Sequence, residues 1–332
     1  MAGRERWASG SSADRLTADA APCILCGGPP SGPAFPFASL WEGTVYRRLG
    51  CARCGCTYVT PLPKLDVLDR LYRPAAYHER FYAGPGDPDS ADSLALIARR
   101  FDRSVTLLDV GCGNGDFLRA AIGSGYRAEG IEQNRQAIAF AARRSDAPVW
   151  SLDQLAASGR RFDLIRLASV QGHLPDPGQT FRRLEALLAP GGHFLVCGPF
   201  EKQPSLVYWT ATSAKRARRM LGRERITAAP PHHLSSVSWA SQRFFLQSVL
   251  GYRLSDIALE DTGWPYLPGD AADRSIGATV RRSVGAAAVR LSRTRIGRRL
   301  GLANSFRLFA TPSDPRVQRP PVDEPTHRDH PG

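Results

Sequence analysis

Short apolar runs alternate with amphipathic segments from residue 104 onward. The apolar runs predict strands at 105–110, 126–132, 147–152, 162–170 and 193–200. The segments between them predict helices at 115–125, 134–144 and 180–190. Strands that alternate with helices form a parallel sheet with right-handed crossovers and helices on both faces. The pattern therefore indicates an α/β fold.

The pattern changes after residue 200. A polar, basic insertion at 201–236 is followed by a predicted helix at 238–251 and two predicted strands at 252–261 and 305–312. A basic helical segment, 279–302, lies between these strands. We therefore predict one domain over 104–311, with basic insertions near 201–236 and 263–303. Residues 312–332 are too polar and proline-rich to fold and are expected to be a disordered tail.

The N-terminal third divides into three parts. Residues 1–20 are polar without periodicity, which predicts a flexible N-terminus, and residues 21–62 contain five of the seven cysteines. Residues 63–103 are expected to be a helical connector. The chain has 332 residues, and no run approaches the roughly 18 apolar residues of a membrane span. Because the N-terminus also lacks an apolar signal segment, the expected location is cytoplasmic.

The formal net charge of +13 is concentrated in two stretches. Residues 201–225 contain seven basic and two acidic residues, and residues 275–310 contain eight arginines and no acidic residue. A basic surface attracts nucleic acid, anionic lipid or a phosphorylated substrate. The alternative is an ordinary solvated face.

Two C-x-x-C-G motifs lie in the cysteine-rich segment: Cys23 and Cys26 form the first, and Cys51 and Cys54 the second. Cysteines clustered in this way in a cytosolic chain indicate a metal site rather than disulfides. Four thiolates suit a closed, tetrahedral, structural zinc site. Cys56 is expected to lie outside the ligand set, and the alternative interpretation is a reduced cluster without metal.

The first predicted strand of the α/β domain runs into a glycine-rich loop. Asp109 is followed by Gly111, Gly113 and Gly115, and a predicted helix begins directly after them. Glycine permits unusual dihedral angles and lets a ligand touch the backbone. Ligands of open α/β sheets bind at the carboxyl ends of the strands. The second predicted strand ends at Glu132, whose carboxylate suits the two hydroxyls of a ribose.

Two cofactor classes compete for this loop. A nicotinamide fingerprint requires a third glycine at 116, but this chain has Asp116, which would face a pyrophosphate. S-adenosylmethionine carries an ammonium and a sulfonium group and needs no pyrophosphate cradle. The acidic rim formed by Asp109 and Glu132 therefore favours S-adenosylmethionine.

Residues 105–200 resemble class I S-adenosylmethionine-dependent methyltransferases in the segments LLDVGCGNGDF, AEGIE, RFDLIRLASVQGHLPDP and ALLAPGGHFLVCGPF. The resemblance implies a Rossmann-like methyltransferase sheet. It implies that Asp109 and the three loop glycines hold the methionine part and that Glu132 binds the ribose. It also places Leu152 and Asp153 near the adenine, and Leu167 and Ala168 near the transferred methyl group.

The region 21–82 resembles a zinc ribbon that precedes many bacterial methyltransferases. The resemblance implies small-molecule substrates, often in sugar, lipid or secondary-metabolite pathways. Together the two resemblances cover roughly residues 21–260.

Two histidines are candidates for the catalytic base. His173 follows the fourth predicted strand, and His233 lies in PPHHLSSVSW, which resembles a family segment that borders the acceptor. A neutral imidazole takes a proton from an attacking hydroxyl near pH 7. We rank His173 ahead of His233, and structural roles for both are the alternative.

The sequence thus predicts transfer of a methyl group from S-adenosylmethionine to a small molecule, by O- or C-methylation, with a structural zinc. Two alternatives are an RNA methyltransferase and a non-catalytic binding protein of the same fold. Nucleic acid is the less favoured partner because the ribbon itself is not notably basic, and peripheral contact with anionic lipid would use the basic segments. The sequence sets neither the acceptor nor the oligomeric state.

Overall fold

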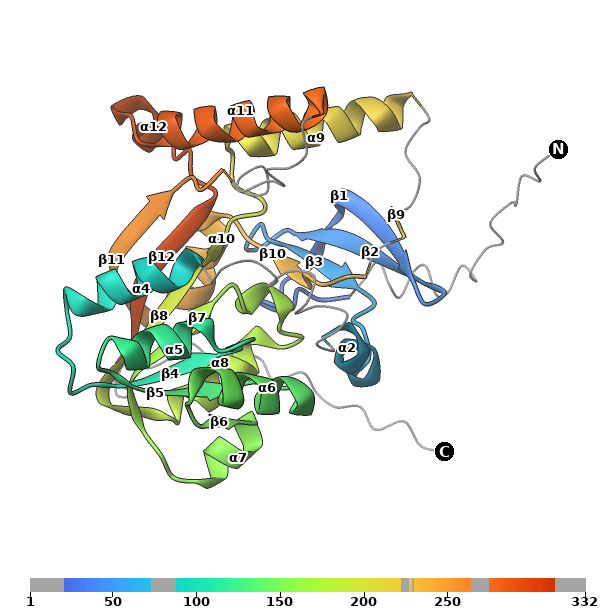
Figure 1. Cartoon of the computed structure of the whole chain (residues 1–332). Helices are drawn as coiled ribbons and strands as arrows, with labels where there is room; N and C mark the ends of the chain where they lie inside the picture. Colours follow the sequence, from blue (N-terminus) through green and yellow to red (C-terminus); the bar gives the residue numbers. More distant parts are fainter. Residues whose placement is uncertain (1–20, 73–87, 222–226, 229, 264–274, 314–332) are drawn as a thin grey trace, which may run out of the picture.

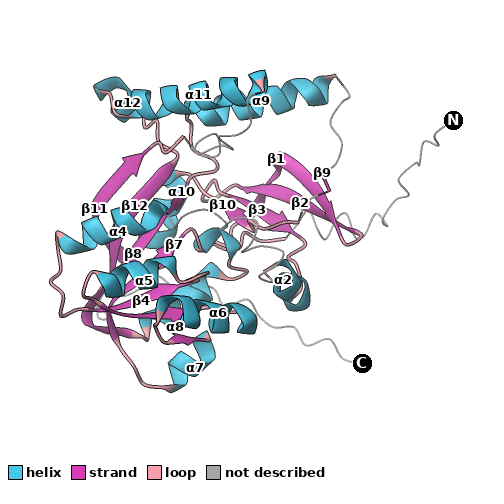
Figure 2. Ribbon diagram, in the orientation of Figure 1, coloured by secondary structure: helices cyan, strands magenta, loops and turns pink. Residues whose placement is uncertain are grey.

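The computed structural model describes residues 21–72, 88–221, 227–228, 230–263 and 275–313. The predicted flexible N-terminus and nearly all of the predicted tail lie outside these ranges. The described residues form a large α/β domain, a smaller sheet beside it and a layer of helices above both (Figure 1). Figure 2 shows the two sheets in magenta.

The main sheet consists, in the described residues, of seven strands in the order β11-β12-β8-β7-β4-β5-β6. They are β4 (Thr106–Val110), β5 (Arg127–Ile131), β6 (Val149–Trp150), β7 (Phe162–Ala168), β8 (Leu188–Pro199), β11 (Tyr252–Glu260) and β12 (Ser305–Pro312). The strands from β4 to β8 pair in parallel, and β12 is antiparallel to both of its neighbours. This arrangement confirms the predicted Rossmann-like α/β fold.

Helices cover both faces of this sheet because successive side chains of a strand point to opposite faces. Leu107 packs with the cluster beneath α4 (Pro88–Ala98), α5 (Asp116–Gly123) and α6 (Arg135–Ser145). Leu108 packs with the cluster on the other face. That face is covered by α7 (Leu152–Ala157), α8 (Pro177–Glu185) and α10 (Trp239–Phe244), which continues as a π-helical turn over Phe245–Val249.

Two element boundaries differ from the prediction. The strand predicted at 193–200 begins at Leu188, because Leu188 pairs with Phe162 of β7 and so extends the sheet where a helix was expected. The strand predicted at 147–152 is only two residues long. It ends there because Ser151 and Gln154 form a capping box that starts α7.

A second, five-stranded sheet occupies the N-terminal region in the described residues, with the order β10-β3-β2-β1-β9. Its strands are β1 (Pro30–Trp41), β2 (Thr44–Cys51), β3 (Thr57–Thr60), β9 (Thr227–Ala228) and β10 (Ser235–Ser236), and α2 (Leu65–Leu71) follows β3. The last two strands come from the stretch predicted to be an insertion in the α/β domain. That insertion therefore joins the two parts of the molecule.

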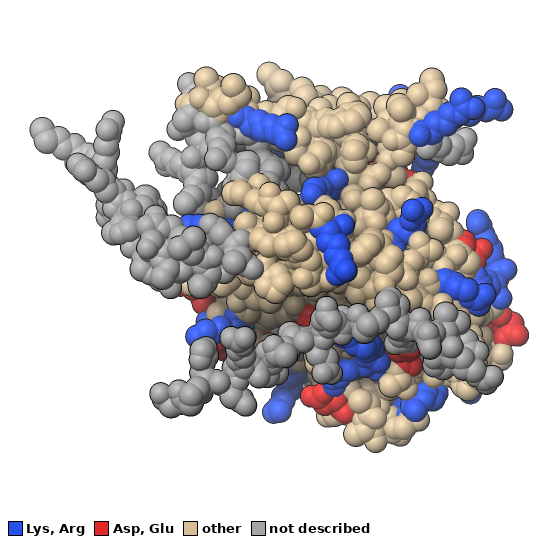
Figure 3. Space-filling model, turned by 180° about the vertical axis from the view of Figure 1, so that it is seen from behind, with Lys and Arg blue, Asp and Glu red and all other residues tan. Residues whose placement is uncertain are grey.

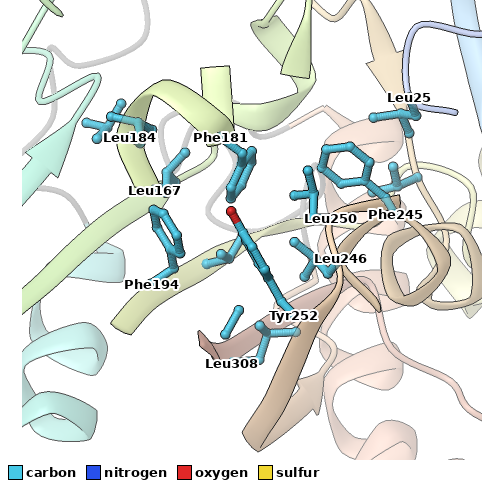
Figure 4. Packing of buried hydrophobic residues seen from close by; sticks show 14 of the residues in the cluster. Leu25, Leu167, Phe181, Leu184, Phe194, Phe245, Leu246, Leu250, Tyr252 and Leu308 are labelled. Carbon is cyan, nitrogen blue, oxygen red and sulfur yellow. The ribbon is translucent and has the colours of Figure 1, made fainter. Parts of the chain in front are cut away.

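The cores of the two parts are continuous. Within the main sheet, Tyr252 of β11 stacks on Phe194 of β8 at 5.5 Å between ring centroids. The same buried cluster extends to Leu25 of the first cysteine motif, which Figure 4 shows beside Phe245. The N-terminal sheet is thus packed against the α/β domain as part of one hydrophobic core.

A layer of helices lies at the end of the molecule opposite α7 (Figure 1). It contains α9 (Leu206–Met220), α11 (Ile276–Ser292) and α12 (Arg295–Arg299), and α9 and α11 pack together. The helical prediction for 279–302 is confirmed, although the segment is split in two, whereas α9 was not predicted. Within the described ranges, no helix has both the length and the apolar character needed to cross a bilayer.

Candidate functional site

The glycine-rich loop leaves β4 through three residues in left-handed conformations, Gly111, Gly113 and Gly115, with φ of 65°, 57° and 80°. A Cβ on Gly111 would lie 2.7 Å from a methyl carbon of Val170. A Cβ on Gly115 would lie 3.0 Å from the Ala141 carbonyl oxygen of α6. Both the dihedral angles and the space therefore require glycine.

Glu132 lies directly beside this loop. Its Oε2 accepts a hydrogen bond from the Gly113 amide at 3.1 Å, and its Oε1 accepts one from the Gln133 amide at 2.8 Å. Burial raises the pKa of Glu132, while these backbone amides oppose the rise. The structure thus brings together the loop and the acidic residue of the second strand.

Asp109 lies beneath the loop in a buried ion pair. Its Oδ1 accepts a hydrogen bond from Nη1 of Arg166 at 2.8 Å, and both side chains are almost fully buried. The Arg166 guanidinium also lies over the Phe117 ring, 4.1 Å from its centroid. Sequence reasoning missed Arg166, although a charged residue inside the apolar run FDLIRLA was a signal. Arg166 balances the charge that Asp109 would otherwise present to a ligand.

The residues assigned by resemblance to the adenine and the methyl group lie at the same edge of the sheet. Leu167 pairs with Val110, the last residue of β4, and Ala168 ends β7. Leu152 and Asp153 begin α7, next to β6. The Asp153 side chain is 88% exposed and forms an ion pair with Arg183.

A small cavity of about 40 Å³ lies beyond the carboxyl ends of β7 and β8. Val170, which touches the glycine loop, lies between two residues that line this cavity, Ser169 and Gln171. Both predicted histidines, His173 and His233, line it too. Their rings lie edge to face, 4.5 Å apart. Residues separated by 60 positions in the chain are therefore neighbours here.

His233 is held by a half-buried carboxylate. Its Nδ1 forms a hydrogen bond with Oε1 of Glu201, and the Ser236 hydroxyl donates to the other carboxylate oxygen. Burial alone would raise the pKa of Glu201, but His233, Arg48 and Ser236 lower it to about 2. Because an ionised carboxylate only accepts hydrogen bonds, Nδ1 of His233 is the donor in this pair, and in the neutral imidazole Nε2 is then the nitrogen with the free lone pair.

Arg48 of β2 supports this pair from the N-terminal sheet. Its Nη1 donates to the Ser236 hydroxyl at 2.8 Å, and its Nη2 donates to the His233 carbonyl oxygen at 2.9 Å. Sequence reasoning missed both Arg48 and Glu201. The position of Glu201 directly after a parallel strand was a signal, but the residue was counted only as part of a basic insertion.

His173 has different surroundings. Its Nδ1 lies 2.9 Å from the Tyr72 hydroxyl and 2.8 Å from the His232 carbonyl oxygen. Burial, with a smaller contribution from the neighbouring His233, lowers the pKa of His173 to about 3. His173 is therefore uncharged at neutral pH and is positioned by neighbouring groups.

The lowered pKa of His173 predicts a pH-dependent stability. Below about pH 6.5 the unfolded chain binds a proton at this residue that the folded protein excludes, so the free energy of unfolding should fall as the pH decreases. We expect His173→Gln to reduce this slope between pH 7 and pH 5, as measured by urea denaturation at each pH. Groups other than residue 173 ionise alike in the wild-type protein and the variant, so their effects cancel in the difference between the two stability curves. Parallel curves would contradict the prediction.

The two cysteine motifs meet in space. The sulfurs of Cys23, Cys26, Cys51 and Cys54 all lie within 4.8 Å of one another. In each motif the glycine after the second cysteine has positive φ, 67° at Gly27 and 75° at Gly55. The amides of both glycines donate to the carbonyl oxygen of the first cysteine of their motif.

Four closely spaced sulfurs fit a tetrahedral zinc ion. Cys56 is fully buried, and its sulfur lies 3.3 Å from that of Cys23. The predicted four-sulfur set is therefore assembled, with a fifth thiol in contact with it.

Residues 78–243 match the family model described as a methyltransferase domain. The chain is 36% identical over 104 residues to dTDP-3-amino-3,6-dideoxy-alpha-D-glucopyranose N,N-dimethyltransferase of Streptomyces fradiae. The aligned region covers 30% of this chain and 41% of that protein. It is 27% identical over 141 residues to a ubiquinone biosynthesis O-methyltransferase of Cereibacter sphaeroides, and this alignment covers 38% of this chain and 57% of that protein. The chain thus spans about half the length of these relatives.

The fold is also similar to that of magnesium protoporphyrin IX methyltransferase from Synechocystis PCC 6803. The two are 13% identical with a TM-score of 0.49, and the match covers 75% of this chain and 100% of the other. The family match includes the glycine loop, Glu132 and both candidate histidines, whereas the two cysteine motifs precede it.

Proposed function

Because the chain belongs to the methyltransferase-domain family, whose model matches half of its length, we propose that it transfers a methyl group from S-adenosylmethionine to a small molecule. The observation that carries the proposal is the junction of two sites at one sheet edge. Val170 contacts the glycine loop that holds Glu132, and its chain neighbours Ser169 and Gln171 line the cavity with the Glu201–His233 pair.

The proposed cofactor residues are those that the family resemblance implies, and this placement supports them. Glu132 would bind the ribose hydroxyls, and the backbone of Gly111, Gly113 and Gly115 would accommodate the methionine part. Leu152 and Asp153 would lie toward the adenine, and Leu167 and Ala168 toward the sulfonium. When bound, S-adenosylmethionine supplies an electrophilic methyl group. The role of Asp109 would be to hold the strand end through Arg166 rather than to offer an unpaired charge.

The acceptor side needs a group that removes a proton. We assign this role to Nε2 of His233, because Glu201 fixes the imidazole by accepting a hydrogen bond from Nδ1. His173 and Tyr72 would position the acceptor or the imidazole ring of His233. The cavity is lined by both histidines and by Glu201, so the reacting group of the acceptor would lie beside them. A hydroxyl acceptor fits best, and an acidic carbon is the second candidate.

Candidate acceptors for a first test are the compounds named in the two relatives. One relative is named for a nucleotide-linked amino sugar and the other for ubiquinone biosynthesis. Incubation with S-adenosylmethionine labelled in the methyl group, and with panels of nucleotide sugars and phenolic quinone precursors, should yield a labelled small molecule. Label that appears only in RNA would favour the alternative of an RNA methyltransferase.

A zinc ion bound by Cys23, Cys26, Cys51 and Cys54 would have a structural role, because four thiolates leave no open coordination position. Zinc would hold the sheet that supplies Arg48 to the pocket. Reduced thiolate ligands suit the cytoplasm, where we place this activity.

Binding of S-adenosylmethionine should depend on Glu132. Glu132→Ala is expected to weaken binding by about 1.5–3 kcal/mol in isothermal titration calorimetry, because hydrogen bonds to a charged group are lost. Glu129→Ala is the matched control, since Glu129 lies on the same strand but accepts a hydrogen bond from Trp150 instead. Absence of binding by the wild-type protein, or a preference for NADH, would refute the cofactor assignment.

A further inference from the structure

The helical layer of α9, α11 and α12 has an unusual distribution of side chains. The buried positions of α11 are all small: Ala278, Gly285, Ala288 and Ser292. They allow α11 to pack closely on α9. Three larger apolar residues of α11, Ile276, Val280 and Leu291, are exposed to solvent, whereas Val284 and Val289 are half-buried.

The exposed apolar residues of α11 form one stripe. Ile276 is 85% exposed and Val280 is 55% exposed. Leu291 is also exposed, and it lies on the same face of the helix because it follows Val280 by about three turns. In α12, Ile296 is 66% exposed, and Leu300 directly after this helix is also exposed. A helix of a globular protein normally turns such residues toward the core. The stripe therefore indicates that this face of the helix contacts another hydrophobic surface.

The charge of the layer has a single sign. No acidic residue occurs between 275 and 310, and the sequence of α9 contains four basic residues and no acidic one. Exposed arginines flank the stripe at Arg290, Arg293, Arg295 and Arg299. Figure 3 shows the layer at the top of the molecule, with blue side chains toward both ends and otherwise tan atoms.

We propose that this layer docks on the surface of an anionic lipid bilayer, with the stripe in the interface and the arginines among the headgroups. Interfacial helices combine these two features. A second copy of the chain fits less well, because it would bring two arginine-rich faces together. RNA would neutralise the arginines but leave the apolar stripe in water. The proposal is independent of the methyl-transfer reaction.

Vesicle co-sedimentation of the full chain tests the proposal. Vesicles of phosphatidylcholine mixed with phosphatidylglycerol should bind the protein at least about tenfold more tightly than phosphatidylcholine alone, and added salt should weaken binding. The triple variant Arg290→Gln, Arg293→Gln, Arg299→Gln should lose about fivefold in affinity for each arginine removed. Ile276→Ser with Val280→Ser should lose about tenfold or more, because apolar area no longer enters the interface.

The matched controls are Arg143→Gln on α6 and Leu65→Ser on α2, where Leu65 is 69% exposed. Both should bind vesicles as the wild-type protein does, and all variants should keep the wild-type melting temperature since every changed residue is exposed. Equal loss in stripe and control variants, or no binding to anionic vesicles, would overturn the proposal. So would a dimer, seen by light scattering, that the stripe variants dissociate while vesicles bind none of the proteins.

Discussion

Replacing His233 with alanine is expected to lower kcat by about 10²–10⁴-fold, the usual contribution of a positioned general base. The affinity for S-adenosylmethionine should change little, because the glycine loop and Glu132 do not line the cavity that contains His233. Steady-state kinetics with an acceptor found in the screen, together with calorimetry of cofactor binding, measures both quantities.

Three further variants make this test specific. Glu201→Gln should also lower kcat, because the imidazole loses the carboxylate that orients it, and Glu201→Asp should recover part of the loss. His173→Ala should have a smaller effect, since its Nδ1 is already engaged by Tyr72 and His232. A large loss in His173→Ala beside near-normal turnover in His233→Ala would move the base to His173. Normal turnover in both would leave positioning and desolvation as the source of catalysis.

Loss of the zinc site is expected to have the largest effect on stability. Structural zinc sites bind with apparent free energies of about 10–16 kcal/mol, comparable with the whole stability of a domain. Cys51→Ser should therefore abolish stoichiometric zinc and sharply lower the melting temperature. Because Cys51, Leu49 and Tyr58 belong to the same core as Phe245, the loss should extend into the α/β domain.

Elemental analysis and thermal denaturation of the purified, reduced protein check this prediction, with one zinc expected per chain. Cys56→Ser is the control, because it keeps the four proposed ligands while removing the thiol that touches Cys23. Wild-type protein without zinc, or an unchanged melting temperature in Cys51→Ser, would contradict the assignment. Loss of zinc in Cys56→Ser alone would show that the ligand set is different.

The parts of the site that could be predicted are those whose geometry is local. The glycine loop, the helix after it and the end of the next strand are set by residues close in sequence, and parallel pairing of β4 with β5 brings Glu132 to the loop. The same holds for the two cysteine motifs, where a single turn places each pair of sulfurs.

The acceptor pocket could not be predicted in the same way. Arg48 reaches Ser236 across 188 positions of the chain, and Tyr72 reaches His173 across 101. No periodicity or spacing relates such residues, because their meeting depends on how the N-terminal sheet packs against the α/β domain. The pairing of β10 with β3 brings the segment around His233 to the cavity.

By itself, the sequence determined the α/β fold, the glycine loop with Glu132 and the two cysteine motifs, since hydrophobic periodicity and turn chemistry act over short distances. Only the tertiary structure decided that Asp109 is neutralised by Arg166 and that Glu201 and Arg48 support His233. It also decided that α11 buries small residues and exposes Ile276, Val280 and Leu291. Each of these outcomes depends on which surface covers a side chain. That surface comes from segments distant in sequence, so only the packing of the whole chain determines it.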